Sequence, residues 1–227
     1  MILSGSGILR HEEWDRWTGI IHGFTTKATP STDPDAGFRT IRVKQVHGCG
    51  VVIADTSEDD IRPGDALVTS TQGLLLTIAT ADCLPVLLYS PSPSVIAAIH
   101  CGWRGLRAEV IAQTFKTMHE KFGVTSERVH ACFGPAIEAC CYEVGLDVVT
   151  PFGEKSVTKK DGRLFLDLAR EACLQLVAAG IAESHILFSH HCTKCDPSLF
   201  HSYRRDGSRT GRQYNFIGLR PHNRQEQ

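Results

Sequence analysis

The chain has 227 residues, and its 42% hydrophobic and 22% charged residues are typical of a globular protein with a sizeable core. Its 24 Lys and Arg residues nearly balance its 25 Asp and Glu residues, so electrostatics gives no support for binding nucleic acid or an anionic membrane. Residues 1–9 lack the pattern of a secretory signal, and no apolar run is long enough to span a membrane. We therefore expect the nine cysteines to be reduced thiols of a cytoplasmic protein rather than an extracellular disulfide framework.

The first third of the chain predicts short strands separated by polar loops. Apolar or alternating segments indicate strands over 20–24, 41–46, 51–53 and 66–69. We expect the strand at 51–53 to be the hairpin partner of the strand at 41–46. Segment 27–37, which carries Pro, Ser, Thr and Asp, and the acidic run 58–60 are typical of exposed loops.

The central stretch, residues 74–105, holds the two longest apolar runs. These runs, Leu74 to Ala79 and Val95 to Ile99, predict two buried strands. The first leads to Cys83, and the second ends at His100, just before a Gly-Trp-Arg-Gly turn. Because reactive residues are often placed at the ends of buried strands, we expect both side chains at the rim of a site.

The second half predicts two helices between further strands. Apolar residues recur with a helical period over 106–122, which Gly123 would close, and Asp167 would cap a second helix that ends at Gly180. Strands are expected over 129–133, 163–166, 186–188 and 214–219. No repeat or linker interrupts the chain, so we predict one domain, residues 1–227, of the α+β class: a layered, mixed β-sheet core with helices packed outside. No G-x-G-x-x-G or Walker loop is present, which argues against a nucleotide cofactor.

Three residues that each end a predicted strand are candidate metal ligands: His47, Cys83 and His100. Three strands of one sheet could bring them together, and two imidazoles with one thiolate suit zinc in a site with an open fourth position. The same residues also fit a cysteine nucleophile, Cys83, with a histidine as its base. Residue chemistry alone leaves a zinc enzyme and a Cys-His hydrolase open, and a strand-end histidine is often only a surface residue.

Other cysteines form the pattern Cys192-x-x-Cys195, directly after two histidines. This pattern suits a structural metal, a redox pair or inert thiols, and a single such pair does not decide among them. The neighbours Cys140 and Cys141 do not easily chelate one metal, so we expect them to pack within a loop.

Arginines gather in two places that suit an anion. Arg104 follows His100 at the start of the predicted helix, where an anion would meet helix amides and a guanidinium together. Arg204 and Arg205 lie in the segment 202–212, where glycines would let backbone N–H groups approach an anion. A solvated basic loop is an equally good interpretation of that segment.

Seven blocks of the sequence resemble the bacterial laccase-domain family, also called multicopper polyphenol oxidases. They are KQVHG at 44–48, DALVT at 65–69, ADCLPVLLY at 81–89, HCGWRG at 100–105, GPAIEACCYEVG at 134–145, LDL at 166–168 and SYRRDGSRTGR at 202–212. Members of this family are generally described as zinc-dependent purine nucleoside phosphorylases. The resemblance implies that His47, Cys83 and His100 are the zinc ligands and the catalytic centre.

The resemblance also implies a reaction. The chain would convert adenosine, inosine and methylthioadenosine with phosphate into free base and sugar 1-phosphate, and it would also deaminate adenosine. Zinc can lower the pKa of a bound water to about 7, as deamination requires. Arg104, Arg204 and Arg205 would hold the phosphate.

Three alternatives stay open at the level of the sequence. Some relatives are associated with peptidoglycan editing, which would make the chain an amidase with Cys83 as its nucleophile. A copper-dependent polyphenol oxidase is the second, although the chain contains no H-x-H pair of the kind that true laccases use. The third is a metal-holding interaction protein without turnover.

The sequence departs from the family pattern at several positions. Lys27 stands where arginine is usual, Cys101 where a small apolar residue is usual, and Glu138 where glycine is frequent. Only residues 27–43 separate Thr26 from the KQVHG block, and this stretch is shorter than is usual in the family. A wall of the pocket is then either missing or supplied by a second subunit of a homo-oligomer.

Overall fold

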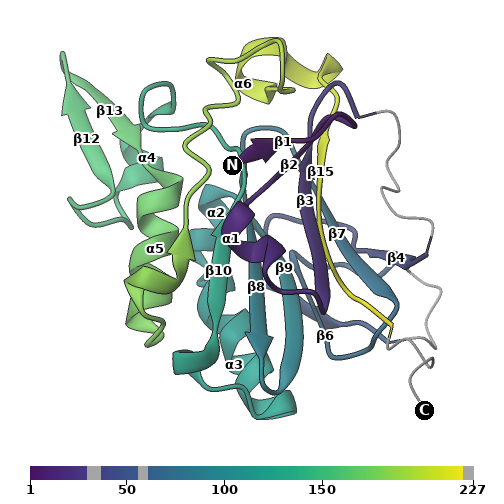
Figure 1. Cartoon of the computed structure of the whole chain (residues 1–227). Helices are drawn as coiled ribbons and strands as arrows, with labels where there is room; N and C mark the ends of the chain where they lie inside the picture. Colours follow the sequence, from purple (N-terminus) through teal and green to yellow (C-terminus); the bar gives the residue numbers. More distant parts are fainter. Residues whose placement is uncertain (30–36, 56–60, 222–227) are drawn as a thin grey trace, which may run out of the picture.

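Two six-stranded sheets lie face to face in the computed structural model, which describes residues 1–29, 37–55 and 61–221 (Figure 1). The first sheet has the order β1 (Ile2–Leu3), β2 (Ile8–Arg10), β3 (Ile20–Thr25), β15 (Gln213–Leu219), β7 (Leu74–Thr80) and β4 (Arg39–Arg42). The second has the order β14 (Ile186–Leu187), β10 (His130–Phe133), β8 (Leu84–Pro91), β9 (Ser94–Cys101), β6 (Ala66–Thr69) and β5 (Val51–Ile53). Both sheets contain parallel and antiparallel pairs, and helices pack outside them. This arrangement confirms the predicted α+β class.

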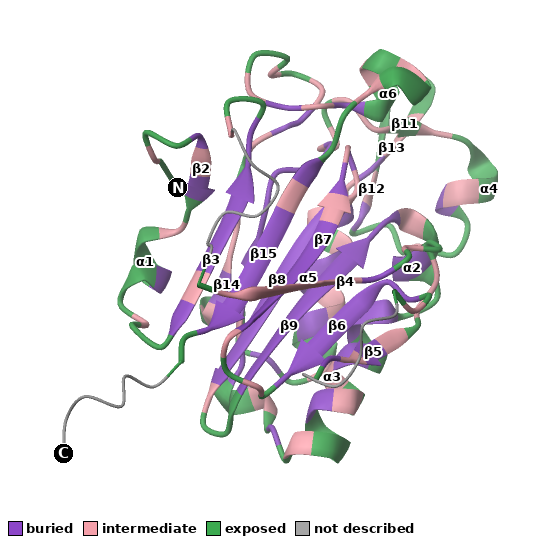
Figure 2. Cartoon of the chain, turned by 90° about the vertical axis from the view of Figure 1, so that its right-hand side faces the viewer, coloured by how far each residue is buried: buried purple, intermediate pink, exposed green. Residues whose placement is uncertain are grey.

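Strand β9 shows why the second sheet is buried on both faces. Successive side chains of a strand point to opposite faces. Accordingly, Ile96 and Ala98 join the apolar core between the two sheets, whereas Val95, Ala97 and Ile99 join a second core under the helices. Figure 2 shows that β7, β8, β9 and β15 are buried over most of their length. A continuous apolar run such as Val95 to Ile99 is the pattern of a strand covered on both faces.

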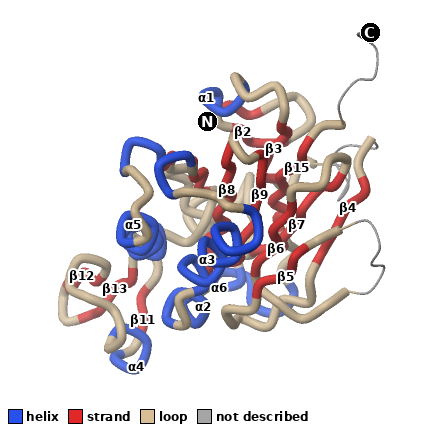
Figure 3. The backbone as a smooth tube through the Cα atoms, turned by 90° about the horizontal axis from the view of Figure 1, so that it is seen from below, coloured by secondary structure: helices blue, strands red, loops and turns tan. Residues whose placement is uncertain are grey.

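The main helices cover one face of the second sheet (Figure 3). The helices are α1 (Glu12–Asp15), α2 (Trp103–Arg107), α3 (Val110–Phe122), α4 (Leu146–Val149), α5 (Leu168–Ala178) and α6 (Tyr203–Asp206). Single turns of 3₁₀ helix occur at Ser126–Arg128, Glu183–His185 and Gly207–Arg209. A small third sheet, with β13 (Arg163–Leu166) between β11 (Glu143–Val144) and β12 (Val157–Lys160), lies beyond α5.

The predicted helix over 106–122 is wrong in one respect, because the chain forms two helices there. Glu109 adopts a left-handed conformation with φ 60°, which ends α2 and starts α3 in a new direction. Leu106, Val110 and Ile111 are all buried in the helix-side core. The bend lets both helices bury apolar residues there, which the helical period alone did not reveal. The second predicted helix is confirmed, with the Asp167 carboxylate accepting a hydrogen bond from the Arg170 amide at 2.8 Å.

The predicted hairpin of the strands near residues 41 and 51 is also wrong. Strand β4 pairs in parallel with β7 in the first sheet, and β5 pairs in parallel with β6 in the second. The connection between them, which carries His47, therefore crosses from one sheet to the other. Local alternation predicted the strands but not which sheet each one joins.

Parts of the expected exposed loops, residues 30–36 and 56–60, lie outside the described residues. In the part of the chain that is described, no helix combines the length and the apolar character that crossing a membrane requires.

Candidate metal centre and its cavity

His47, Cys83 and His100 converge at one end of the two sheets. One potential ligand atom from each lies within 4.8 Å of the others. His100 is near the end of β9, and Cys83 immediately precedes β8, whose antiparallel pairing places Leu84 beside Cys101. The connection from β7 to β8, like the one that carries His47, crosses between the sheets. The expected convergence is thus present, but at the junction of two sheets rather than along three strands of one.

Asp65, which is fully buried, organises the two histidines. Its carboxylate accepts hydrogen bonds from the backbone N–H groups of His47 at 2.9 Å and Gly48 at 2.7 Å. A third bond joins it to Nδ1 of His100 at 2.8 Å. The other ring nitrogen of His100 is thereby directed toward Cys83. Carboxylates that orient a metal-binding imidazole in this way are typical of metal sites.

The backbone around the cluster is strained and closely packed. His47 and Asp82 both have positive φ angles, 58° and 87°, which are unusual for residues other than glycine. At Gly102, an added Cβ would lie 3.1 Å from Sγ of Cys83 and 3.3 Å from Nδ1 of His47. Glycine leaves this space beside the ligand atoms free.

The electrostatics of the cluster favour a thiolate. Burial opposes ionisation of Cys83, but His100 and His47 outweigh it and lower the pKa of this thiol to about 6. Burial also opposes protonation of His100, yet Cys83 and Asp65 raise its pKa to about 9. Two imidazoles and a thiolate with an ordered carboxylate behind them form a donor set that fits zinc and leaves one position open.

A cavity of about 650 Å³ opens above these three residues. Its walls carry the aromatic rings of Tyr142 and Tyr203 and the guanidinium groups of Arg104, Arg204 and Arg212. The Arg104 guanidinium lies 4.5 Å from the centre of the Trp103 ring, and Arg204 lies 5.1 Å from that of Tyr142. Cationic and aromatic groups therefore surround one opening, which suits a ligand with both an anionic group and a flat ring.

Of the three arginines predicted to bind an anion, two line the cavity and one does not. Arg104 and Arg204 line the cavity, and Arg104 belongs to the five-residue helix α2 and not to the long helix α3. The guanidinium of Arg205 donates to the carbonyl oxygens of Thr193, Lys194 and Phe200. It also bonds to Asp206, so these contacts give Arg205 a structural role.

Cys101 does not face the cluster, although it follows His100 in the sequence. Strand alternation directs its side chain into the core under the helices, where it is fully buried. Burial raises the pKa of its thiol well above the usual value. Cys101 therefore contributes packing and not a fourth ligand.

Cys140 and Cys141, for which we expect packing within a loop, also have neighbours from a distant segment. They lie with Cys192 and Cys195 in a second group, in which the four sulfur atoms are within 4.8 Å of one another. Sequence reasoning also missed the roles of Asp65 and Gly102. The only sequence signal for these two residues was their place in the DALVT and HCGWRG blocks. A single buried aspartate and a single glycine produce no periodic pattern.

Comparisons with known proteins agree with this architecture. Residues 32–220 match the family model described as multi-copper polyphenol oxidoreductase laccase. A purine nucleoside phosphorylase of Deinococcus radiodurans is 42% identical over 183 residues, which cover 78% of this chain and 69% of that protein. Adenosine deaminase RL5, from an unknown prokaryotic organism, is 32% identical over 191 residues, covering 77% of this chain and 72% of that protein. The crystal structure of YlmD from Geobacillus stearothermophilus superimposes with a TM-score of 0.86 at 28% identity, covering 96% of this chain and 98% of that one.

Proposed function

Because the chain belongs to the multi-copper polyphenol oxidoreductase laccase family, we propose that it is a zinc-dependent purine nucleoside phosphorylase that also deaminates adenosine. Its substrates would be adenosine, inosine and methylthioadenosine, together with phosphate. One observation carries the proposal: His47, Cys83 and His100 converge at the base of a cavity that is lined by arginines and tyrosines. Because the cavity draws on residues from Gln45 to Arg212, residues 1–227 would act as one domain.

His47, Cys83 and His100 would hold the metal. A bound zinc ion would supply Lewis acidity and an activated water at the base of the cavity. Asp65 would keep Nδ1 of His100 protonated, so that the other nitrogen remains available as a ligand. Copper is less suitable, because among the described residues this is the only histidine-containing group with metal-binding spacing, whereas true laccases need several copper ions.

The tyrosines and arginines would bind the substrates. Tyr203 offers an aromatic face on which a purine ring can stack. Burial raises the pKa of Tyr142 to about 12, so its hydroxyl stays protonated at neutral pH and can donate a hydrogen bond to the leaving base. Arg104 would bind phosphate, and Arg204, which donates to the Glu143 carbonyl at 2.7 Å, would add a second positive charge held in place.

The reaction is tested by incubating the zinc-loaded protein with adenosine, with and without phosphate, and measuring adenine, inosine and hypoxanthine. We expect adenine to form only with phosphate, and inosine to form in both cases. His47→Ala should abolish both activities and lower the zinc content, whereas His119→Ala, on the exposed surface of α3, should change neither. Absence of adenine from the zinc-loaded protein with phosphate would refute the proposal.

One observation favours a second function, a hydrolase with Cys83 as nucleophile. Asp65, His100 and Cys83 are arranged like the acid, base and nucleophile of a cysteine hydrolase. An amidase acting on a peptidoglycan precursor would use this arrangement. His47 has no place in such a triad, so a His47→Ala variant that keeps amidase activity would favour the hydrolase.

Arg104→Ala separates phosphate binding from the rest of the site. Loss of the guanidinium should raise the KM for phosphate by at least about tenfold, because charge-assisted hydrogen bonds are worth about 1.5–3 kcal/mol. Phosphate-independent deamination should change much less. Arg107→Ala, on the same short helix but outside the cavity, is the matched control. An unchanged phosphate saturation curve would remove Arg104 from the phosphate site.

A further inference from the structure

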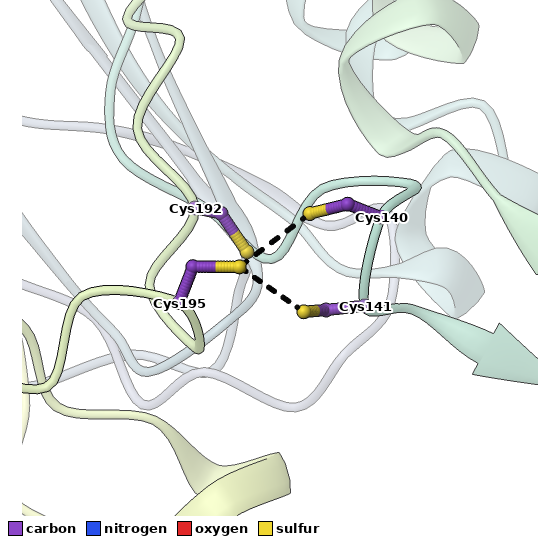
Figure 4. A group of neighbouring side chains, drawn as sticks. All are labelled: Cys140, Cys141, Cys192 and Cys195. Carbon is purple, nitrogen blue, oxygen red and sulfur yellow. Dashed lines mark hydrogen bonds between the residues drawn. The ribbon is translucent and has the colours of Figure 1, made fainter.

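A second group of metal-ligating side chains lies apart from the cavity residues. Cys140 and Cys141 follow β10 along the chain, and Cys192 and Cys195 follow β14 (Figure 4). These two strands pair in parallel, so the segments that follow them leave the sheet at the same edge. A parallel bridge between Ala136 and Cys192 then keeps the two segments side by side.

The sulfur positions match a single tetrahedral metal ion. Zinc–sulfur bonds of about 2.3 Å in a regular tetrahedron place neighbouring sulfur atoms about 3.8 Å apart. Sγ of Cys195 lies 3.7 Å from Sγ of Cys140 and 3.3 Å from Sγ of Cys141. All four sulfur atoms lie within 4.8 Å of one another, and no disulfide joins them. In Figure 4 the four side chains point toward one centre from two backbone segments.

Backbone N–H groups surround one of the four sulfur atoms. Those of Glu138, Cys195 and Lys194 donate hydrogen bonds to Sγ of Cys192. Backbone donors to the sulfur of a Cys-x-x-Cys turn are typical of metal–thiolate sites. The Glu138 carbonyl also accepts the N–H groups of Cys141 and Tyr142, both at 2.9 Å, which forms the turn that carries the first pair. This gives residue 138 a backbone role that does not depend on its side chain.

We propose that Cys140, Cys141, Cys192 and Cys195 bind one structural zinc ion, separate from the metal at His47, Cys83 and His100. Four thiolates with tetrahedral spacing are the donor set of structural zinc, and such a closed shell leaves no position for substrate. Two of the cysteines are exposed, so the site is open for loading. Each zinc ion that binds would release the protons of the thiols that are still protonated.

The position of this site gives the zinc ion a structural role. The zinc ion would join two distant segments of the chain. The cysteines whose sulfur atoms meet there are 54 and 55 residues apart in the sequence. Tyr142, which follows the first pair, lines the cavity, and Thr193, between the second pair, bonds to the Asp82 carboxylate at 2.6 Å. The zinc would therefore fix the wall of the cavity nearest to Cys83.

The proposal is tested by the zinc content of the full-length protein, measured by mass spectrometry after purification under reducing conditions. Cys195→Ser should lose one zinc per chain relative to the unmodified protein, and its Tm should fall by roughly 5–10 °C. Cys173→Ala, which removes a buried thiol outside both groups, should keep the full zinc content. Cys83→Ser reports on the other site, so failure at one site is distinguishable from failure at the other.

X-ray absorption at the zinc edge of the Cys83→Ser protein gives a second readout. We expect four sulfur neighbours at about 2.3 Å and no nitrogen or oxygen neighbour. This measurement does not require the Cys195 variant to fold. Equal zinc content in Cys195→Ser and unmodified protein, a mixed sulfur–nitrogen shell, or a disulfide among the four cysteines would each overturn the proposal.

Discussion

The two ligand groups of this protein are held in different ways. His47, Cys83 and His100 lie where chain segments cross between two buried sheets, with the carboxylate of Asp65 behind them. The four cysteines lie on two segments at the edge of one sheet, and the partners of their sulfur atoms among the described residues are other sulfur atoms and backbone N–H groups. The difference predicts that the folded core alone fixes the first group, whereas the second would depend on its proposed zinc ion for rigidity.

The largest effect that separates the two groups should come from Asp65→Asn. The amide keeps the size of the side chain but loses the charge that holds Nδ1 of His100 and the amides of His47 and Gly48. Loss of such an orienting carboxylate typically reduces metal affinity or activity by 10–100-fold. We expect this loss at the histidine-containing site only, measured by zinc competition with a chromogenic chelator.

Asp147→Asn, on the short helix α4 away from both groups, is the control for Asp65→Asn. If Asp65→Asn also released zinc from the four cysteines, the two groups would not be independent.

Thr193→Val tests whether the segment that carries Cys192 and Cys195 helps to position Cys83. The hydroxyl of Thr193 donates to the buried carboxylate of Asp82, which immediately precedes Cys83. Removing a hydrogen bond to a charged group should lower the free energy of unfolding by about 2 kcal/mol, measured by urea denaturation. Activity should fall as well, while the zinc content stays the same.

Thr158→Val, at an exposed position of β12, should have little effect on either quantity. A Thr193→Val protein that is less stable but fully active would show that the cysteine segment supports the fold without positioning Cys83.

The smallest effect concerns His22, a buried histidine outside both groups. Burial, together with the charges of Arg10 and His11, lowers its pKa to about 3. An unfolded histidine has a pKa near 6.5, so the unfolded state binds one more proton than the folded state between these two values. Stability should therefore fall with decreasing pH, by about 1 kcal/mol between pH 6.5 and 5.5 for this residue.

His22→Gln should reduce that slope, because glutamine does not titrate but can still accept the bond from the His11 amide. Denaturation curves at several pH values give the measurement. An unchanged slope would assign the acid sensitivity to other histidines. His100 differs from His22 because a buried carboxylate and a thiol accompany it, and these raise its pKa.

Local patterns in the sequence determined the buried strands and the Asp167 cap, and they marked His47, Cys83 and His100 only as candidates, which the family resemblance then favoured as ligands. Continuous apolar runs report burial on both faces, and a reactive residue at the end of such a run reports a site. The seven sequence blocks carried the family assignment, which the match over residues 32–220 bears out.

Only the tertiary structure decided which sheet each strand joins, where the helix after Arg107 breaks, and that Cys140 and Cys141 meet Cys192 and Cys195. Strand pairing and ligand convergence are long-range events, which hydrophobic periodicity over a few residues does not encode. Asp65 likewise has no local signal, because its importance comes from the backbone of residues 46–48 and the ring of His100, which converge on its carboxylate once the sheets have packed.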